Sequence, residues 1–293
     1  MPELPEVETM RFQLEKFLVG SVIKDIKVKT PNIVTGDYKK LLGQKVISVR
    51  RFAKVSSIDF SNNFSLLTHV KLTGQFIYRG PKLNNDGKLS KKVVGGLGGP
   101  HTHVTFDFED GGVLYYNDIR KFGWIRIMPT IDVENEKFVK TLGPEPNVAK
   151  GSAGQALTFE YFSRLLSKSK RNIKVLLMDQ SKIGGVGNIY ANDALWESGI
   201  SPKRVSNSLS DQESKLLYDA IHAVLKSGLK YGGASELAFV TPDGKEGEYQ
   251  NHTLVYGHTG EVCKRPACRQ TGATVEKFFL GGRGTYWCPS CQK

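Results

Sequence analysis

The sequence predicts an α+β multidomain protein, in which an N-terminal β-sandwich with a leading helix is followed by a helical domain and a cysteine-bearing hairpin. Apolar residues recur at helical spacing up to residue 20, alternate with a period of two over 21–128, and return to helical spacing after residue 158. All four cysteines lie in the last 31 residues. A chain of 293 residues is long enough for two or three units that each bury a core. We therefore expect a sandwich domain over 1–130, a linker over 131–157, a helical domain over 158–252 and a hairpin module over 253–293.

The first eight residues, MPELPEVE, combine a reactive terminus with the start of a helix. Proline at position 2 is small enough for the initiator methionine to be removed, which leaves a secondary amine. Such an amine forms a cationic iminium with an aldehyde-like carbon, and its pKa of about 8, against about 10.4 for lysine, leaves part of it unprotonated at neutral pH. Pro2 is therefore a candidate nucleophile. The alternative is a plain helix start, because Pro5 and the glutamates around it suit a first helical turn.

The next 120 or so residues predict one helix and then a series of strands. Val7, Met10, Leu14 and Phe17 form one apolar face of a helix that ends at Gly20. Alternating runs follow at 22–28, 64–72 and 104–108, and the polar segments 61–63 and 110–112 are expected to be hairpin turns between strands. Residues 81–100 are rich in glycine and lysine, and we expect them to form a basic surface loop without chemistry.

The helical region is marked by capping residues and by a glycine-rich turn. Thr158 is expected to cap one helix, and Ser210 with Glu213 forms the capping box of another. The segment GGVGN at 184–188 comes directly before a helix, where free backbone amides can hold a phosphate. With Lys170 and Lys174 upstream, the segment predicts a clamp for a nucleic-acid backbone that includes Asn188. A plain turn between helices is the alternative.

Charge and cysteine usage indicate the class of partner and a metal site. A net charge of +12 and a pI near 9.4 favour nucleic acid as the partner over a membrane, since we find neither an amphipathic anchor nor an apolar run long enough to span a bilayer. We find no signal peptide and expect a cytoplasmic protein. The spacing Cys263-x4-Cys268-x19-Cys288-x2-Cys291 is typical of one tetrahedral Zn²⁺ site, and free or redox-active thiols are the alternative.

Two further segments carry residues suited to contact with DNA. Arg283 lies on the flexible tip GGRGT, within the stretch between the two cysteine pairs, where it can enter a groove or bind a phosphate. The segment DIRKFG at 118–123 places Arg120 beside Phe122. An exposed phenylalanine at such a place can insert into a base stack and replace an extruded base, although a buried ring is the common explanation.

The chain resembles formamidopyrimidine-DNA glycosylases along its whole length. MPELPEVE, the D-x-R-K-F-G segment, LGPEP, GVGNIYA and the terminal cysteine hairpin occur in the order typical of that family. The resemblance implies a β-sandwich, a helix-two-turn-helix domain and a zinc finger that hold DNA between them. It also implies a bifunctional glycosylase and AP lyase that removes oxidised purines, such as 8-oxoguanine and formamidopyrimidines, in base-excision repair.

The resemblance also implies roles for individual residues. Pro2 matches the Schiff-base nucleophile, Glu3 the adjacent acid/base group and Lys54 the active-site lysine, while Arg283 matches a DNA contact that is associated with δ-elimination. Phe122 matches the intercalating aromatic residue. The remaining matches are DNA contacts: His69, His101, Arg120 and Asn188. One structural Zn²⁺, damaged double-stranded DNA as the partner and a monomeric state follow from the same resemblance.

The sequence departs from the family pattern at three places, one of which is Arg51-Phe52-Ala53 in place of the usual double-arginine register before Lys54. Leu72 stands where the family usually has methionine, and Lys71 where it commonly has glycine, so the residues that fill the space of the extruded base are altered. The first cysteine pair is spaced x4 where the family has x2, which still lies within known zinc-ligand spacings. Two other functions remain open: an endonuclease VIII-like enzyme for oxidised pyrimidines, and a non-catalytic zinc-ribbon protein that only binds DNA.

Overall fold

The computed structural model describes residues 1–83, 88–94, 96–149 and 151–293. The chain divides into two compact units, each assembled from three stretches of sequence. The first contains residues 1–140, 149–153 and 228–250, and the second contains residues 141–148, 154–227 and 251–293. Among the described residues, no helix combines the length and apolar character needed to cross a membrane.

The first unit begins with helix α1 (Leu4–Leu18), which carries the expected apolar face. Its side chains at Val7, Met10, Leu14 and Phe17 are buried, as the helical spacing predicted. The helix ends where expected, because Gly20 adopts a φ of +88° that favours glycine. The chain amino terminus is thereby attached to an element that is anchored in the core.

Two sheets follow α1, as the alternating pattern predicted. One sheet has the strand order β1 (Ile23–Val28), β7 (Thr102–Phe108), β8 (Val113–Asp118) and β6 (Gly74–Arg79), with antiparallel pairs throughout. The other has the order β2 (Val34–Thr35), β9 (Trp124–Pro129), β5 (Phe64–His69), β4 (Val55–Phe60) and β3 (Val46–Phe52), in which only the short β2 pairs in parallel. The turns predicted at 61–63 and 110–112 join β4 to β5 and β7 to β8.

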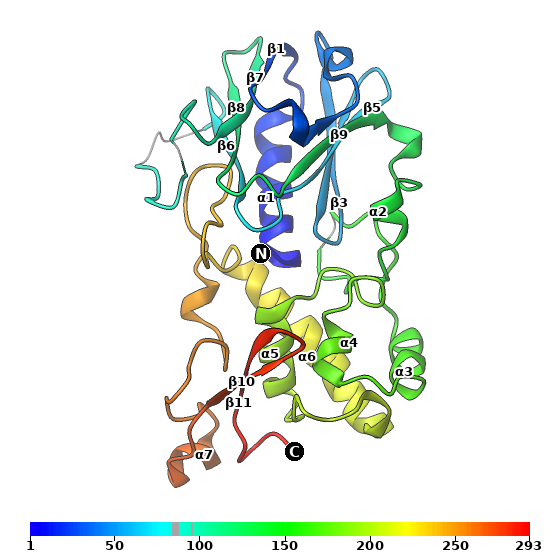
Figure 1. Ribbon diagram of the computed structural model, residues 1–293, viewed down its shortest axis with the longest axis vertical. Coiled ribbons are helices and arrows are strands. Elements are labelled where there is room, and N and C mark those ends of the chain that lie inside the picture. The colour runs from blue at the N-terminus through cyan, green and yellow to red at the C-terminus, as the bar shows by residue number, and fades with distance from the viewer. Residues whose placement is uncertain (84–87, 95, 150) are drawn as a thin grey trace. The chain divides into compact units, whose positions relative to one another are not determined.

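The core of the first unit lies between the two sheets and against α1. Buried apolar side chains from α1 and from both sheets form one cluster, which includes Leu14 of α1, Val49 of β3 and Phe106 of β7. In Figure 1 the labelled strands of the two sheets lie on opposite sides of α1. This arrangement is a β-sandwich with a leading helix, which confirms that part of the predicted fold.

Residues 228–250 pack with the first unit, and they comprise the last three residues of the long helix α6 (Asp211–Lys230) and the segment after it. The backbone N–H of Ala234 donates to the Glu6 carboxylate of α1 at 2.7 Å, and the N–H of Tyr78 in β6 donates to the carbonyl of Pro242 at 2.7 Å. The compact units therefore divide the chain differently from the expected segment 158–252. The expected linker also contributes structure, since it contains the short helix α2 (Lys137–Lys140).

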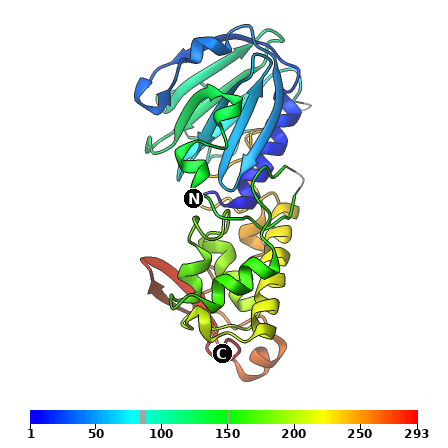
Figure 2. The same ribbon diagram turned by 90° about the vertical axis from the view of Figure 1, so that its right-hand side faces the viewer.

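The second unit combines helices with a two-stranded hairpin. Its elements are α3 (Phe159–Ser167), α4 (Ile173–Leu177), α5 (Asn188–Glu197), the greater part of α6, α7 (Pro266–Thr271), β10 (Glu276–Leu280) and β11 (Arg283–Trp287). The predicted caps are present, because the hydroxyl of Thr158 accepts from Tyr161 N–H and Ser210 exchanges hydrogen bonds with Glu213. Figure 2 shows the β10–β11 hairpin, in red, projecting beside the helices of this unit.

Candidate active site and metal centre

The amino terminus of the first unit lies in a cluster of buried charged groups. Glu3, Glu6 and Lys54 have relative exposures of 3%, 1% and 3%. One Glu6 oxygen accepts from the backbone N–H of Glu3 at 2.7 Å, while the other accepts from Ala234. The charges of Glu3, Glu6, Lys54 and Glu236 act on the terminal amine, and we call these four residues and the amine the amino-terminal cluster.

Burial is the largest influence on the terminal amine, and it lowers the pKa of that amine below its usual value. The carboxylates of Glu3, Glu6 and Glu236 act in the opposite direction, and the positive charge of Lys54 acts with burial. A lowered pKa increases the fraction of amine that holds a free lone pair at neutral pH. With Met1 in place this amine belongs to Met1, and the nitrogen of Pro2 is an amide.

A second network of buried charges joins α1 to β3 and to the turn between β3 and β4, which carries Lys54. The guanidinium of Arg51 is fully buried and donates to the Glu8 carboxylate at 2.7 Å and to the carbonyl of Ala53 at 2.9 Å. Glu8 also pairs with Arg11 at 2.9 Å. Ala53 has a φ of +50°, so the hydrogen bond from Arg51 holds a strained turn directly before Lys54. The network thereby positions Lys54.

His69 lies at the end of β5 with a relative exposure of 4%. Its Nδ1 accepts a hydrogen bond from the backbone N–H of Lys71 at 3.0 Å, so the ring proton must lie on Nε2. Burial, followed by the charges of Lys71 and Lys54, lowers the pKa of His69 to about 3. The side chain is therefore a neutral imidazole whose Nε2–H is its hydrogen-bond donor.

Leu72, Arg120 and Phe122 lie on two adjacent turns that Asp118 holds together. One oxygen of the buried Asp118 carboxylate accepts from Thr73 and from Arg120 N–H, and the other accepts from Gly123 N–H at 2.9 Å. The N–H of Arg120 also lies 3.2 Å from the Thr73 hydroxyl. We call residues 70–73 and 118–123 the wedge loops.

The wedge loops expose the residues that the sequence singled out. Phe122 has a relative exposure of 54%, and the Arg120 guanidinium lies 4.6 Å from its ring centroid. Leu72 is half-buried beside them. Glycine is required at position 123, because a Cβ there would collide with the Tyr116 hydroxyl. His101 is also half-buried, and its carbonyl accepts from Asp118 N–H at 2.9 Å.

In the second unit, Asn188 and Arg283 lie on elements that pack together. Asn188 is the first residue of α5 and is half-buried, while Arg283 is exposed at the start of β11. The side-chain oxygen of Asn192, one turn beyond Asn188, accepts from the N–H of Tyr286 in β11 at 2.9 Å. Lys170 is exposed and lies in a cavity of about 450 Å³ whose lining includes four other cationic residues.

The structure corrects the expectation that Lys174 is a surface contact. Its side chain is fully buried, and its ammonium group donates to the carbonyl of Gly284 at 2.9 Å and to the hydroxyl of Thr285 at 2.7 Å. These acceptors follow Arg283 directly in sequence. Lys174 therefore holds the hairpin and does not present its charge to solvent.

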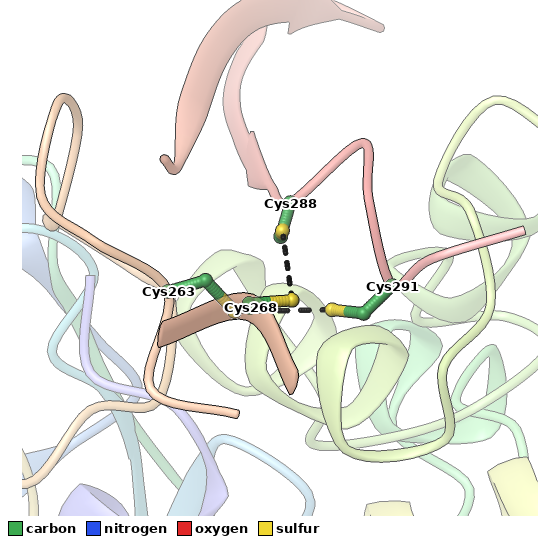
Figure 3. A group of neighbouring side chains, drawn as sticks. All are labelled: Cys263, Cys268, Cys288 and Cys291. Atoms are coloured by element: carbon green, nitrogen blue, oxygen red, sulfur yellow. Dashed lines mark hydrogen bonds between the residues drawn. The ribbon is translucent and has the colours of Figure 1, made fainter. Parts of the chain in front are cut away.

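The four cysteines converge on one point, as Figure 3 shows. All are free thiols, and their sulfur atoms lie within 4.8 Å of one another. The separations are 3.8 Å for Cys263 to Cys291 and 3.8 Å for Cys268 to Cys288. A tetrahedral thiolate site with Zn–S bonds of about 2.3 Å requires sulfur atoms roughly 3.8 Å apart. The donor set could therefore hold one metal ion.

Sequence reasoning missed several residues of these sites. Glu6 could have been found, since E-x-x-E at the start of a helix is a variant of the capping-box pattern. Glu236 and Arg51 had no local signal, because their partners are remote in sequence.

Comparison with known proteins identifies the class and then the family. In the first unit the chain amino terminus lies beside α1 in a cluster of ionisable groups, and the helical second unit carries a four-cysteine hairpin. This arrangement is the one expected of a DNA glycosylase that uses its terminal amine. Family models match residues 1–125 as the formamidopyrimidine-DNA glycosylase N-terminal domain and residues 142–239 as the H2TH domain of the same family. The chain belongs to the formamidopyrimidine-DNA glycosylase family, which confirms the resemblance seen in the motifs.

Individual relatives match the chain from end to end. The formamidopyrimidine-DNA glycosylase of Lactiplantibacillus plantarum is 37% identical over 297 residues, with full coverage of both chains. A solved structure of a Lactococcus lactis Fpg variant with Fapy-dG containing DNA has a TM-score of 0.82 at 34% identity and covers both chains fully. Wild-type Lactococcus lactis Fpg with DNA that contains an oxidised pyrimidine gives 0.81 at 35% identity, again with full coverage.

Proposed function

We propose that this chain excises oxidised purines, including 8-oxoguanine and formamidopyrimidines, from duplex DNA and then cleaves the strand at the abasic site. The observation that carries the proposal is the amino-terminal cluster, in which the buried Glu3, Glu6 and Lys54 surround the start of the chain. Burial lowers the pKa of the Met1 amine there, and removal of Met1 would leave the Pro2 amine beside the same groups. A net charge of +12 supports DNA as the partner. Membership of a family of bifunctional glycosylases and lyases supports both activities.

The mechanism begins when removal of Met1 converts the Pro2 nitrogen into a secondary amine. Its lone pair attacks C1′ of the damaged nucleotide, the bond between C1′ and the base breaks, and the base leaves with that electron pair and a proton. The attached nitrogen then loses its proton, the C1′–O4′ bond breaks as O4′ takes up a proton, and C1′ and the nitrogen form an iminium. This iminium acidifies the proton on C2′, so the 3′ phosphate leaves by β-elimination and the 5′ phosphate by δ-elimination. Glu3 transfers the protons of these steps, as a buried carboxyl at the amine is able to do.

The DNA contacts are proposed residue by residue. Lys54 neutralises a phosphate next to the attacked sugar, and His69 donates its Nε2–H to another without carrying charge. His101 and Arg120 bind phosphates, while Leu72 and Phe122 fill the space that the extruded base leaves. In the second unit the proposed contacts are Lys170, Asn188 and Arg283. The buried Lys174 supports the hairpin and contacts no phosphate itself.

The metal is proposed to be one structural Zn²⁺ held by Cys263, Cys268, Cys288 and Cys291. The donor set supports zinc, because four thiolates satisfy all tetrahedral positions and leave none for substrate. The ion supplies no chemistry to the reaction and stabilises the hairpin that carries Arg283. We further propose that residues 1–130 act as the catalytic domain, 158–252 as the helix-two-turn-helix domain and 253–293 as the zinc finger, in a cytoplasmic monomer that acts on chromosomal DNA.

The decisive experiment traps the iminium. Borohydride added during reaction with an 8-oxoguanine duplex should reduce the intermediate and join protein to DNA, and peptide mapping should place the bond at Pro2. Glu3→Gln should lower excision by on the order of 100-fold, as loss of a general acid/base group does. Intact mass decides first whether Met1 is absent. A fully active chain that retains Met1, or an adduct at Lys54, would refute Pro2 as the nucleophile.

A second candidate function is excision of oxidised pyrimidines. The solved complex of Lactococcus lactis Fpg with DNA that contains an oxidised pyrimidine is the observation that favours it. A panel of duplexes that differ only in one lesion separates the two functions. Faster cleavage of the pyrimidine lesions than of 8-oxoguanine or formamidopyrimidine would replace the first proposal with the second.

A further inference from the structure

Residues 88–94 of the first unit lie in the segment expected to be a basic surface loop, and hydrogen bonds join them to residues 235–246. The backbone N–H of Ser90 donates to the carbonyl of Gly244 at 2.9 Å, and its hydroxyl donates to the Glu246 carboxylate at 2.6 Å. Leu89 packs against Gly244, where a Cβ would collide with it. We call residues 88–94 the strap. Residues 84–87 and 95, which belong to the same expected loop, lie outside the described residues.

Lys92 of the strap and Gln75 of β6 hold two carbonyl groups of the segment 235–238. The ammonium group of Lys92 donates to the carbonyl of Ser235 at 2.5 Å and pairs with Glu246 at 2.7 Å. Gln75, which is 2% exposed, donates through one amide nitrogen to the carbonyl of Ala238 and to that of Lys92. The Gln75 oxygen accepts from Val94 N–H at 3.1 Å. The side chain of Gln75 therefore binds the strap and the segment together.

The carbonyl groups of Ser235 and Ala238 flank Glu236 and Leu237, which we call the tip. Leu237 has a φ of +51° and a relative exposure of 69%. An exposed, branched apolar residue in a left-handed conformation is unfavourable both in backbone strain and in hydration, so its surroundings must impose it. The contacts at Ser235 and Ala238 supply that constraint, one on each side.

The tip lies at the amino-terminal cluster. Ala234, two residues before it, donates to Glu6 at 2.7 Å, and the carboxylate of Glu236 acts on the terminal amine. In the proposed reaction the damaged base is bonded to the carbon that the amine attacks, so the base must lie within a few ångströms of the amine. An exposed leucine offers van der Waals surface to a planar base but no hydrogen bond to a sugar or a phosphate.

We propose that the strap is a positioning element, in which Lys92 and Gln75 fix the tip beside the terminal amine and so set the rate at which an intact damaged base is excised. The inference rests on the proposed function. Neither residue touches the reacting atoms. The surface ion pair between Lys92 and Glu246 contributes little by itself, and the constraint comes from the hydrogen bonds to the two carbonyls.

The test compares Lys92→Met with Lys91→Met in the full chain. Both variants remove one positive charge from the strap, and Lys91 makes no hydrogen bond or ion pair with the described residues. Single-turnover rates are measured on duplexes of one sequence that carry either a formamidopyrimidine lesion or a preformed abasic site. Lys92→Met should slow excision on the order of 10-fold, as misplaced contacts do, and leave cleavage of the abasic site unchanged. Lys91→Met should leave both unchanged.

Equal losses on both substrates, or no loss on either, would overturn the proposal. Amide hydrogen exchange gives a second readout that needs no activity, because Lys92→Met should speed exchange over 235–239 and not in α1. Unchanged exchange over 235–239 would also overturn it. If the wild-type chain acts on neither substrate, the proposed function fails, while the exchange experiment still decides whether the strap holds the tip.

Discussion

His69 should make the first unit sensitive to acid, because the fold holds this side chain neutral. The imidazole is 4% exposed and lies edge-on to Trp124 and Phe138, with ring centroids 6.0 Å and 5.5 Å away. Its Nδ1 already accepts the Lys71 N–H, so protonation would place two N–H groups against each other. These surroundings hold the pKa of His69 at about 3, against 6.5 for a free imidazole.

The sign and size of the effect follow from proton linkage. Between pH 6.5 and 3 the unfolded chain binds a proton at His69 that the folded chain does not, so the free energy of unfolding falls as the pH falls. The loss is about 1.4 kcal/mol for each pH unit below the unfolded pKa, which amounts to roughly 4 kcal/mol near pH 3.5. Above pH 6.5 this contribution does not change with pH.

His69→Asn tests this reasoning, since the asparagine oxygen can accept the same N–H and does not titrate. Amide exchange of β5 in increasing urea, measured at pH 7, 5 and 4, reports unfolding of the first unit in both proteins. Every other titrating group is common to the two, so the difference in their pH dependence belongs to His69. The wild type should lose more stability than the variant at each step below pH 6.5. Parallel losses in the two proteins would refute the neutral, buried imidazole.

Three other predictions concern the cysteine cluster, the exposed Arg283 and the buried ion pair of Arg51. Cys288→Ser should release the metal, measured by elemental analysis, and weaken DNA binding, since metal binding and folding are coupled in such modules; a variant that keeps stoichiometric zinc would contradict this. Arg283→Ala should reduce the slope of log affinity against log salt by about 0.9, the effect of one lost phosphate contact, and by more than Lys91→Ala does; equal changes would exclude the hairpin contact. Arg51→Met should lower the free energy of unfolding, measured in urea, by about 3 to 5 kcal/mol, because it removes one partner of the buried Glu8 carboxylate. Lys215→Ala, at the exposed pair with Asp219, should change it by less than about 0.5 kcal/mol. Similar losses in the two variants would refute the difference between the buried and the exposed pair.

Periodicity predicted those elements whose faces differ in burial. The spacing of Val7, Met10, Leu14 and Phe17 marked α1 because one stripe of that helix enters the sandwich core. The alternating runs predicted β1, β5 and β7, and the polar segments predicted the two hairpin turns. They did not single out β4 and β6, whose residues are buried at nearly every position and show no alternation. The cysteine cluster was predicted from spacing alone, because structural zinc sites are commonly built from two close pairs of ligands.

Contacts that join distant parts of the sequence could not be predicted in this way. Glu6 binds Ala234, and Lys92 binds the carbonyl of Ser235, across more than 140 residues in each case. Lys92 looks like an ordinary surface charge in the sequence, and the capping pattern at Glu6 indicates only its local contact with Glu3. Their partners are backbone groups, which carry no residue-specific signal, so the placement of residues 228–250 in the first unit had no local indication.

If the hairpin binds DNA as proposed, Lys174 should support that binding although its side chain is buried. Its ammonium group donates to the acceptors of Gly284 and Thr285, directly beyond Arg283. Replacement by a neutral residue would leave those acceptors buried and release β11, so the loss should resemble that of Arg283→Ala in affinity. An exposed lysine such as Lys170 differs, because removing it subtracts only its own attraction to a phosphate. We therefore expect Lys170, before α4, to contribute to DNA binding through its charge, and Lys174, within α4, to contribute through the geometry of the hairpin.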